Sequence, residues 1–124
     1  MKDYPLEYYE FFVKFNEDDY YTCHDLLEEI WLIETDNFFL KGLLQMTVAL
    51  YHYGYGNVKG ARAMMGAAKR YLQPYRPHYW SLDVEYVLHF VEKCLAIIPA
   101  DIDRVSFEES KRLPVLPDLV LYME

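Results

Sequence analysis

Four polar side chains that can do chemistry lie among apolar and aromatic residues in the segment 20–61 of this chain: His24, Glu28, Gln45 and His52. Burying a polar group without a partner costs roughly 1–3 kcal/mol in proteins. Such groups therefore indicate either a specific hydrogen-bond network between helices or a functional site. Two imidazoles and one carboxylate can act as acid and base, and they are also a known ligand set for zinc or iron.

Three interpretations of these residues stay open on the sequence alone. In the first, Glu28 orients His24 one helical turn away, within a buried network that fixes the register of two helices. Gln45 and His52 would join this network if the next helix faces the first. In the second, His24, Glu28 and His52 bind a divalent metal, although the HxxxE spacing offers no evident fourth ligand. In the third, Glu28 and a histidine act without metal, either as acid and base or by binding a polar ligand. Apart from the metal of the second interpretation, no cofactor is predicted.

Helical patterns position these residues. Apolar side chains recur at helical spacing in five segments: 6–15, 17–34, 38–53, 57–73 and 81–98. Asn16, Asn37, Asn57 and Ser81 are the expected N-caps of the last four segments, because their side chains can accept a hydrogen bond from the first helical turn. Glycines at 54 and 56 should end the third segment. No strand alternation or hairpin turn is evident.

The third helical segment is expected at the centre of the fold. Residues 37–53 are apolar almost all round, as is typical of a helix surrounded by others. After residue 100 we expect one helical turn around 107–113 and then an extended tail, PVLPDLVLYME, packed on the bundle. The sequence thus predicts an all-α fold, a single domain over residues 1–124 with about five helices.

Composition narrows the class of protein. The 124 residues are 53% apolar and 18% aromatic, and 12 basic against 20 acidic residues give a formal charge of −8. Such a chain has no bulk attraction for nucleic acid or for an anionic membrane. No apolar stretch reaches the roughly 20 residues that span a bilayer. Cys23 and Cys94 form no metal-binding spacing and are expected as free, buried thiols, which predicts a cytoplasmic protein.

The fourth helical segment carries a basic face made of Lys59, Arg62, Lys69 and Arg70. On an acidic protein this cluster could bind a small anionic ligand. The alternative is a solvated face that balances acidic neighbours.

The ordered residues of the central segment resemble the domain-of-unknown-function 309 family. The pattern is Phe15-Asn16, Tyr20, His24, Glu28, Trp31, Phe39, Gly42-Leu43, Gln45, Tyr51-His52, Asn57 and Gly60-Ala61. The resemblance implies a compact helical bundle from a mainly prokaryotic group of small proteins, and it implies no known activity. It makes Trp31, Gln45 and Asn57 candidate pocket or network residues beside His24, Glu28 and His52.

Two functional hypotheses follow. The leading one is a small, non-catalytic binding or assembly module, with an unidentified protein partner or a second copy of the chain. Weak catalytic signals and a surplus of aromatic residues favour it. The alternative is an enzyme of unknown reaction, with or without a metal, that uses His24, Glu28 and His52 as catalytic residues.

Overall fold

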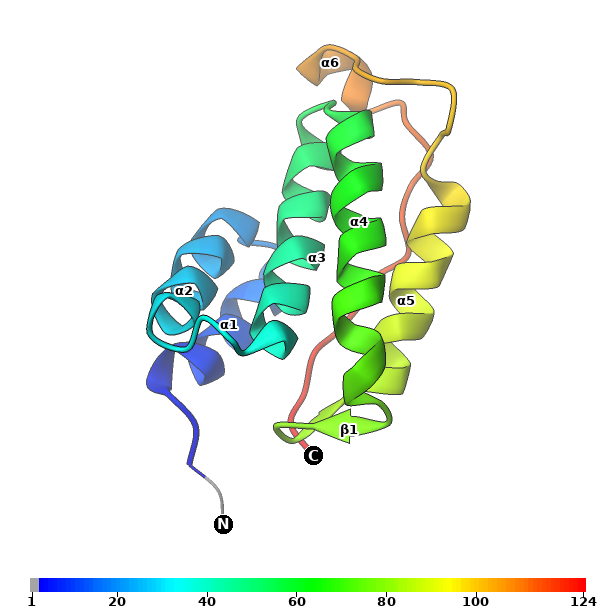
Figure 1. The fold of residues 1–124 in the computed structure, drawn as a ribbon. Helices are drawn as coiled ribbons and strands as arrows, with labels where there is room; N and C mark the ends of the chain where they lie inside the picture. Colours follow the sequence, from blue (N-terminus) through cyan, green and yellow to red (C-terminus); the bar gives the residue numbers. More distant parts are fainter. Residues whose placement is uncertain (1–2) are drawn as a thin grey trace.

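Five long helices dominate the computed structural model, which describes residues 3–124 (Figure 1). They are α1 (Leu6–Asn16), α2 (Tyr20–Ile33), α3 (Phe38–Gly54), α4 (Val58–Leu72) and α5 (Val84–Ile97). A 3-10 turn, Gln73–Tyr75, follows α4, and a short helix α6 covers Phe107–Ser110. The predicted all-α bundle is confirmed. Within residues 3–124, none of the helices has both the length and the hydropathy needed to cross a bilayer.

Helix α3 occupies the centre of the bundle, as predicted. It packs against α2 on one side and α4 on the other, while α1 covers α2 and α5 covers α4 (Figure 1). Phe39, Leu43 and Met46 on α3 are completely buried. Gly42 lets α4 approach, because a Cβ there would lie 2.7 Å from Cγ of Leu72. Because glycine has no side chain, α3 and α4 can pack closely at this position.

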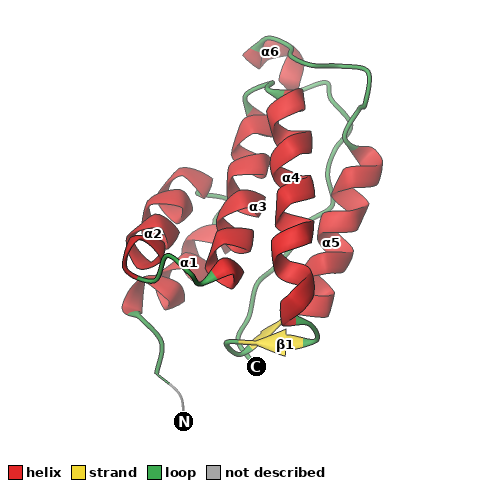
Figure 2. Cartoon of the chain, viewed as in Figure 1, coloured by secondary structure: helices red, strands yellow, loops and turns green. Residues whose placement is uncertain are grey.

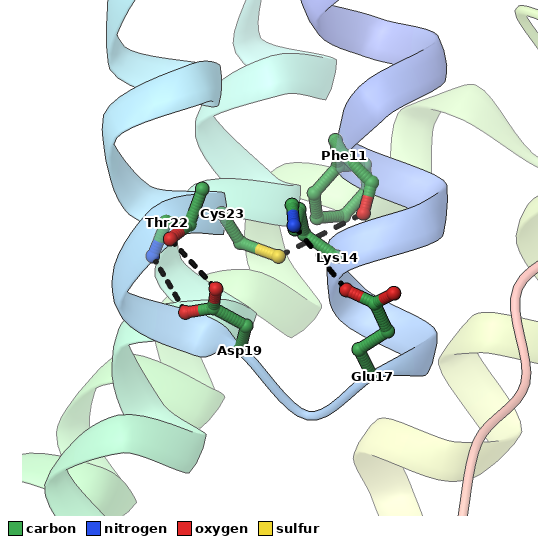
Figure 3. A network of polar contacts seen from close by, with 6 residues as sticks. All are labelled: Phe11, Lys14, Glu17, Asp19, Thr22 and Cys23. Atoms are coloured by element: carbon green, nitrogen blue, oxygen red, sulfur yellow. Dashed lines mark hydrogen bonds and ion pairs between the residues drawn. The ribbon is translucent and has the colours of Figure 1, made fainter.

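Two of the four predicted N-caps are confirmed and two are wrong. Asn37 and Asn57 accept hydrogen bonds from backbone N–H groups in the first turns of α3 and α4. Asp19, not Asn16, caps α2: it accepts from the backbone N–H and the hydroxyl of Thr22 (Figure 3). The reason is that residues 17–19 form a turn after α1, so α2 begins later than the pattern indicated. Helix α5 likewise begins two residues late and is capped by Asp83 instead of Ser81.

A small hairpin corrects the expectation that the chain has no strands. Strands β1 (His78–Tyr79) and β2 (Leu82–Asp83) pair antiparallel before α5, shown in yellow in Figure 2. The two turn residues, Trp80 and Ser81, have φ values of 49° and 56°. Two-residue hairpin turns need such positive φ values and usually take Asn or Gly, so Trp-Ser gave no signal. Tertiary contacts hold this turn, among them a 2.9 Å hydrogen bond from the Tyr8 hydroxyl to the Trp80 carbonyl.

The C-terminal segment returns along the bundle as an extended strap, as predicted. It runs from α6 back to the hairpin, so the C-terminus lies beside β1 (Figure 1). Leu113 and Leu121 are buried against the helices. The side-chain amide of Asn16 donates to the Leu121 carbonyl and accepts from its N–H, both at 2.8 Å. The residue expected to cap a helix therefore fastens the tail.

Both cysteines are free and buried, which confirms that part of the prediction. Burial is the main cause that raises the pKa of the Cys23 and Cys94 thiols to about 12. Thiols with such a pKa remain protonated at neutral pH and are poor nucleophiles. They act here as small apolar side chains of the core.

Candidate functional site

An open groove of about 300 Å³ lies between α2 and α3. Its lining is three residues from each helix: Tyr20, Tyr21 and His24 from α2, and Val48, Tyr51 and His52 from α3. The wall is thus mainly aromatic, with an imidazole contributed by each helix. The structure brings the two predicted histidines to one surface feature, which we call the α2–α3 groove.

His24 lies at the edge of this groove in contact with two carboxylates. Its Nε2 is 3.4 Å from Oε2 of Glu28, and its Nδ1 is 3.4 Å from Oδ1 of Asp25. The predicted pairing of His24 with Glu28 is confirmed. The predicted burial is wrong, since the side chains of His24 and Glu28 are 40% and 47% exposed. Helix α2 is an outer helix, and α1 and α3 leave this side of it open to solvent.

His52 is held by Asn57 at the start of α4. The amide nitrogen of Asn57 is 3.3 Å from Nδ1 of His52, while the amide oxygen accepts from the Gly60 N–H at 3.0 Å. Because the N-cap fixes the amide orientation, Asn57 is the donor and Nδ1 the acceptor. A neutral His52 ring then carries its proton on Nε2. Desolvation, followed by the charge of Arg104, lowers the pKa of His52 below its ordinary value, which favours the neutral ring.

Gln45 and Trp31 do not join the histidines. Nζ of Lys41 on α3 lies 4.5 Å above the Trp31 ring, a cation–π contact that links α3 to α2. Nε1 of Trp31 is buried without a hydrogen-bond partner among residues 3–124. Gln45 is half-buried, and within the same residues its side chain makes no hydrogen bond. The buried network predicted for His24, Glu28, Gln45 and His52 is therefore not formed, because each histidine bonds residues close to it in sequence.

The structure offers little support for the predicted metal site. In the described part of the chain, no three His, Cys, Asp or Glu side chains gather closely enough to hold a metal ion. His24 and Glu28 contact each other, but His52 on the opposite wall bonds Asn57 instead. We therefore derive no chemistry through a metal.

A row of four aromatic rings, three of them exposed and one half-buried, extends the groove, and sequence reasoning missed it. Ring centroids are 6.1 Å apart for Tyr21 and Tyr51, 4.8 Å for Tyr51 and Tyr55, and 5.4 Å for Tyr55 and Phe107. Three of its members are largely exposed, Tyr21 by 64%, Tyr55 by 56% and Phe107 by 50%, whereas Tyr51 is half-buried. Only Tyr51 and Tyr55 share a helical spacing that the sequence could reveal. Tyr21 and Phe107 join this aromatic row through the tertiary fold.

The basic face of α4 is partly occupied by the protein itself. Arg62 donates to the carbonyl groups of Pro99 and Ile102 and contacts Asp103 at 3.3 Å, which anchors the segment after α5. Its guanidinium is thus engaged in the fold. Lys59, Lys69 and Arg70 are left for a small anion, and that site stays a prediction.

The comparisons with known proteins bear on the same segment. The family model described as "Domain of unknown function (DUF309)" matches residues 8–64, from α1 into the first half of α4. This confirms the resemblance over those residues, which include both histidines of the groove. The description assigns no activity.

A curated relative matches a stretch of 74 residues but supplies no function. The chain is 36% identical over 74 residues to "Uncharacterized protein YpuF" of Bacillus subtilis (strain 168). The match covers 56% of this chain and 42% of the relative, so this chain spans less than half of that protein's length. No solved structure matches the chain.

Proposed function

We propose that this protein is a non-catalytic binding module that takes an apolar side chain of a partner polypeptide into the α2–α3 groove. The observation that carries the proposal is the aromatic row, which places four rings in succession on the surface beside the groove. Tyr21 and Tyr51 belong to both features. A partner could therefore bury one side chain in the groove and lie across the neighbouring rings.

Physical chemistry supports a polypeptide as the ligand. Tyrosine gives a large contact area at a low cost in side-chain entropy, and it is enriched where interfaces gain most of their free energy. A groove of about 300 Å³ is at the lower limit of small-molecule sites, and it suits one side chain such as Leu or Phe. The neutral His52 ring, with its proton on Nε2, can donate to a backbone carbonyl of such a partner.

A selection from a library of random peptides tests this proposal. We expect peptides rich in apolar residues to be enriched on the wild-type protein. Their binding should weaken at least about tenfold in the Tyr51→Ala variant, the loss that about 1.4 kcal/mol at one central ring would cause. Tyr86→Ala is the matched control, since Tyr86 is exposed on helix α5 outside the groove. Peptides that bind Tyr51→Ala and wild type equally would overturn the proposal.

The partner could also be a second copy of the chain, which sedimentation distinguishes from a foreign polypeptide. A dimer that dissociates on Tyr51→Ala, but not on Tyr86→Ala, would identify the partner as a second copy. We propose the cytoplasm as the location of this module, because two free thiols in a protein suit a reducing compartment.

An enzyme that uses the same groove is the second candidate function. It is favoured by one observation: His24, with carboxylates at both ring nitrogens, and the neutral His52 line the same groove. Two imidazoles in different environments can serve as acid and base. Hydrolysis assays with generic ester and phosphate substrates test it, with His52→Gln as the variant. An activity that His52→Gln leaves unchanged would rule out this role.

A further inference from the structure

A second, half-open cavity of about 480 Å³ lies along the C-terminal strap, and it is more open to solvent than the α2–α3 groove. Residues of α1, the turn after it, α2, α3 and α5 line one side of this cavity, and residues 116–120 of the strap line the other. The strap is fastened before and after these residues. The Tyr53 hydroxyl donates to the Pro114 carbonyl at 2.6 Å, and Asn16 binds the backbone of Leu121. The cavity is therefore preformed, which lowers the cost of binding a ligand.

The lining of this strap cavity combines aromatic rings with negative charge. Four aromatic residues contribute to it: Phe15, Tyr20, Tyr53 and Phe90. Among residues 3–124, the only charged side chains in the lining are two aspartates, Asp18 and Asp118, and no Lys, Arg or His takes part. Within residues 3–124 neither aspartate forms an ion pair with a basic side chain. Two carboxylates without an ion-paired partner among these residues thus lie beside aromatic side chains in the strap cavity.

One of the two carboxylates is hydrogen-bonded to an aromatic residue of the lining. Tyr20 donates its hydroxyl hydrogen to Oδ1 of Asp18 at 3.1 Å. Burial is the first cause that raises the pKa of Tyr20, and the charges of Asp18 and Asp118 raise it further. Aspartates from opposite ends of the sequence therefore line the same cavity as this phenol. A positive charge placed there would interact with both.

We propose that the strap cavity binds an alkylammonium group, carried by a small molecule of the size of choline or by a methylated lysine side chain. Aromatic faces attract such cations through their quadrupoles, and the attraction is largest where water is excluded. The two carboxylates supply the counter-charge. The methyl groups of a quaternary ammonium suit the apolar floor formed by Phe15, Leu50 and Phe90.

Choline and 3,3-dimethyl-1-butanol form a matched pair of probes, because a carbon atom replaces the charged nitrogen in the alcohol. Binding is followed by amide chemical shifts in two-dimensional NMR spectra of the full chain. We expect choline to shift amides around the strap cavity and to bind at least about tenfold more tightly than the alcohol, because its charged nitrogen interacts both with the aromatic rings and with the two carboxylates. Equal affinities, or shifts confined to other parts of the protein, would overturn the proposal.

Isosteric variants remove the charge of each carboxylate without disturbing the fold. Asp118→Asn and Asp18→Asn should each weaken choline binding by about three- to tenfold and leave binding of the alcohol unchanged. Asn is well suited to position 18, where φ is 62°. Asp101→Asn is the control, since Asp101 is exposed and lies outside the cavity lining. Choline binding that survives both cavity variants would contradict the proposed site.

A short peptide with one trimethyllysine distinguishes the two sources of the cation. If the peptide binds more tightly than choline, a side chain of a partner protein is the ligand. If choline binds more tightly, the ligand is a small molecule. Failure of both cations to bind would refute the proposal, and it would leave the peptide site of the α2–α3 groove unaffected.

Discussion

Replacing His24 with alanine should change the free energy of unfolding by no more than about 0.5 kcal/mol. A histidine sealed in a network between helices would instead cost about 1–3 kcal/mol on removal. The two outcomes differ enough to separate a structural role from a site on the surface. The expected change in the free energy of unfolding follows from two contributions, the exposed pairs that His24 forms and the helix propensity of alanine.

The contacts of His24 are those of a surface residue. Both carboxylates lie at 3.4 Å, and the side chains of Asp25 and Glu28 are 63% and 47% exposed. Exposed pairs of this kind contribute about 0–1 kcal/mol. Alanine recovers about 0.5 kcal/mol or more through its higher helix propensity in α2. The two contributions nearly cancel.

Urea denaturation followed by far-ultraviolet circular dichroism measures this difference. Leu27→Ala on the same helix is the control, because Leu27 is completely buried and its truncation should cost about 2–5 kcal/mol. Gln45→Ala should stay within about 1 kcal/mol of wild type, since no hydrogen bond of this side chain is lost. A loss above about 2 kcal/mol for His24→Ala would refute the exposed-groove interpretation.

Three further predictions concern other parts of the fold. Asn16→Ala removes both hydrogen bonds to the strap and should lower the free energy of unfolding by about 1–2 kcal/mol. Hydrogen exchange of residues 114–124 should become faster, and unchanged exchange there would contradict the role of Asn16. Gly56→Ala should destabilise the protein by more than about 1 kcal/mol in thermal unfolding, because φ is 87° and a Cβ would collide with the Val105 carbonyl. His52 should titrate in NMR spectra below its ordinary pKa of about 6.5, since burial disfavours its charged form. The contribution of His52 to the free energy of unfolding is then complete above about pH 6.5, and it is lost as the pH falls through the lowered pKa. A titration midpoint of His52 above about pH 6.5 in the NMR spectra would contradict the prediction.

The helices of this protein follow from local signals in the sequence. Asn37 and Asn57 cap the helices that were predicted for them, and α3 ends as expected at its first glycine, Gly54, with Gly56 at φ 87° just beyond it. These features depend on hydrogen bonds and backbone angles within one or two turns. Local patterns also identified α3 as the central helix, because it is apolar almost all round.

Capping was less predictable where two polar residues compete. Asn16 and Asp19 can both cap a helix, and the spacing alone does not decide between them. The strap decides, because the Leu121 backbone takes up the Asn16 amide more than one hundred residues along the chain. The hairpin at Trp80 and Ser81 is a similar case, since contacts from Tyr4 and from Tyr8 on α1 hold a turn that the residues do not favour.

The sequence by itself determined which residues are helical, which helix is central and which segment carries the family pattern. The tertiary structure alone decided that His24 faces solvent, that His52 bonds Asn57, and that Tyr21 and Phe107 meet on one surface. The physical reason is the range of the interactions. Helix propensity and caps act between near neighbours, whereas the exposure of a helix face depends on which distant elements cover it. The α2–α3 groove and the strap cavity both lie where that covering is incomplete.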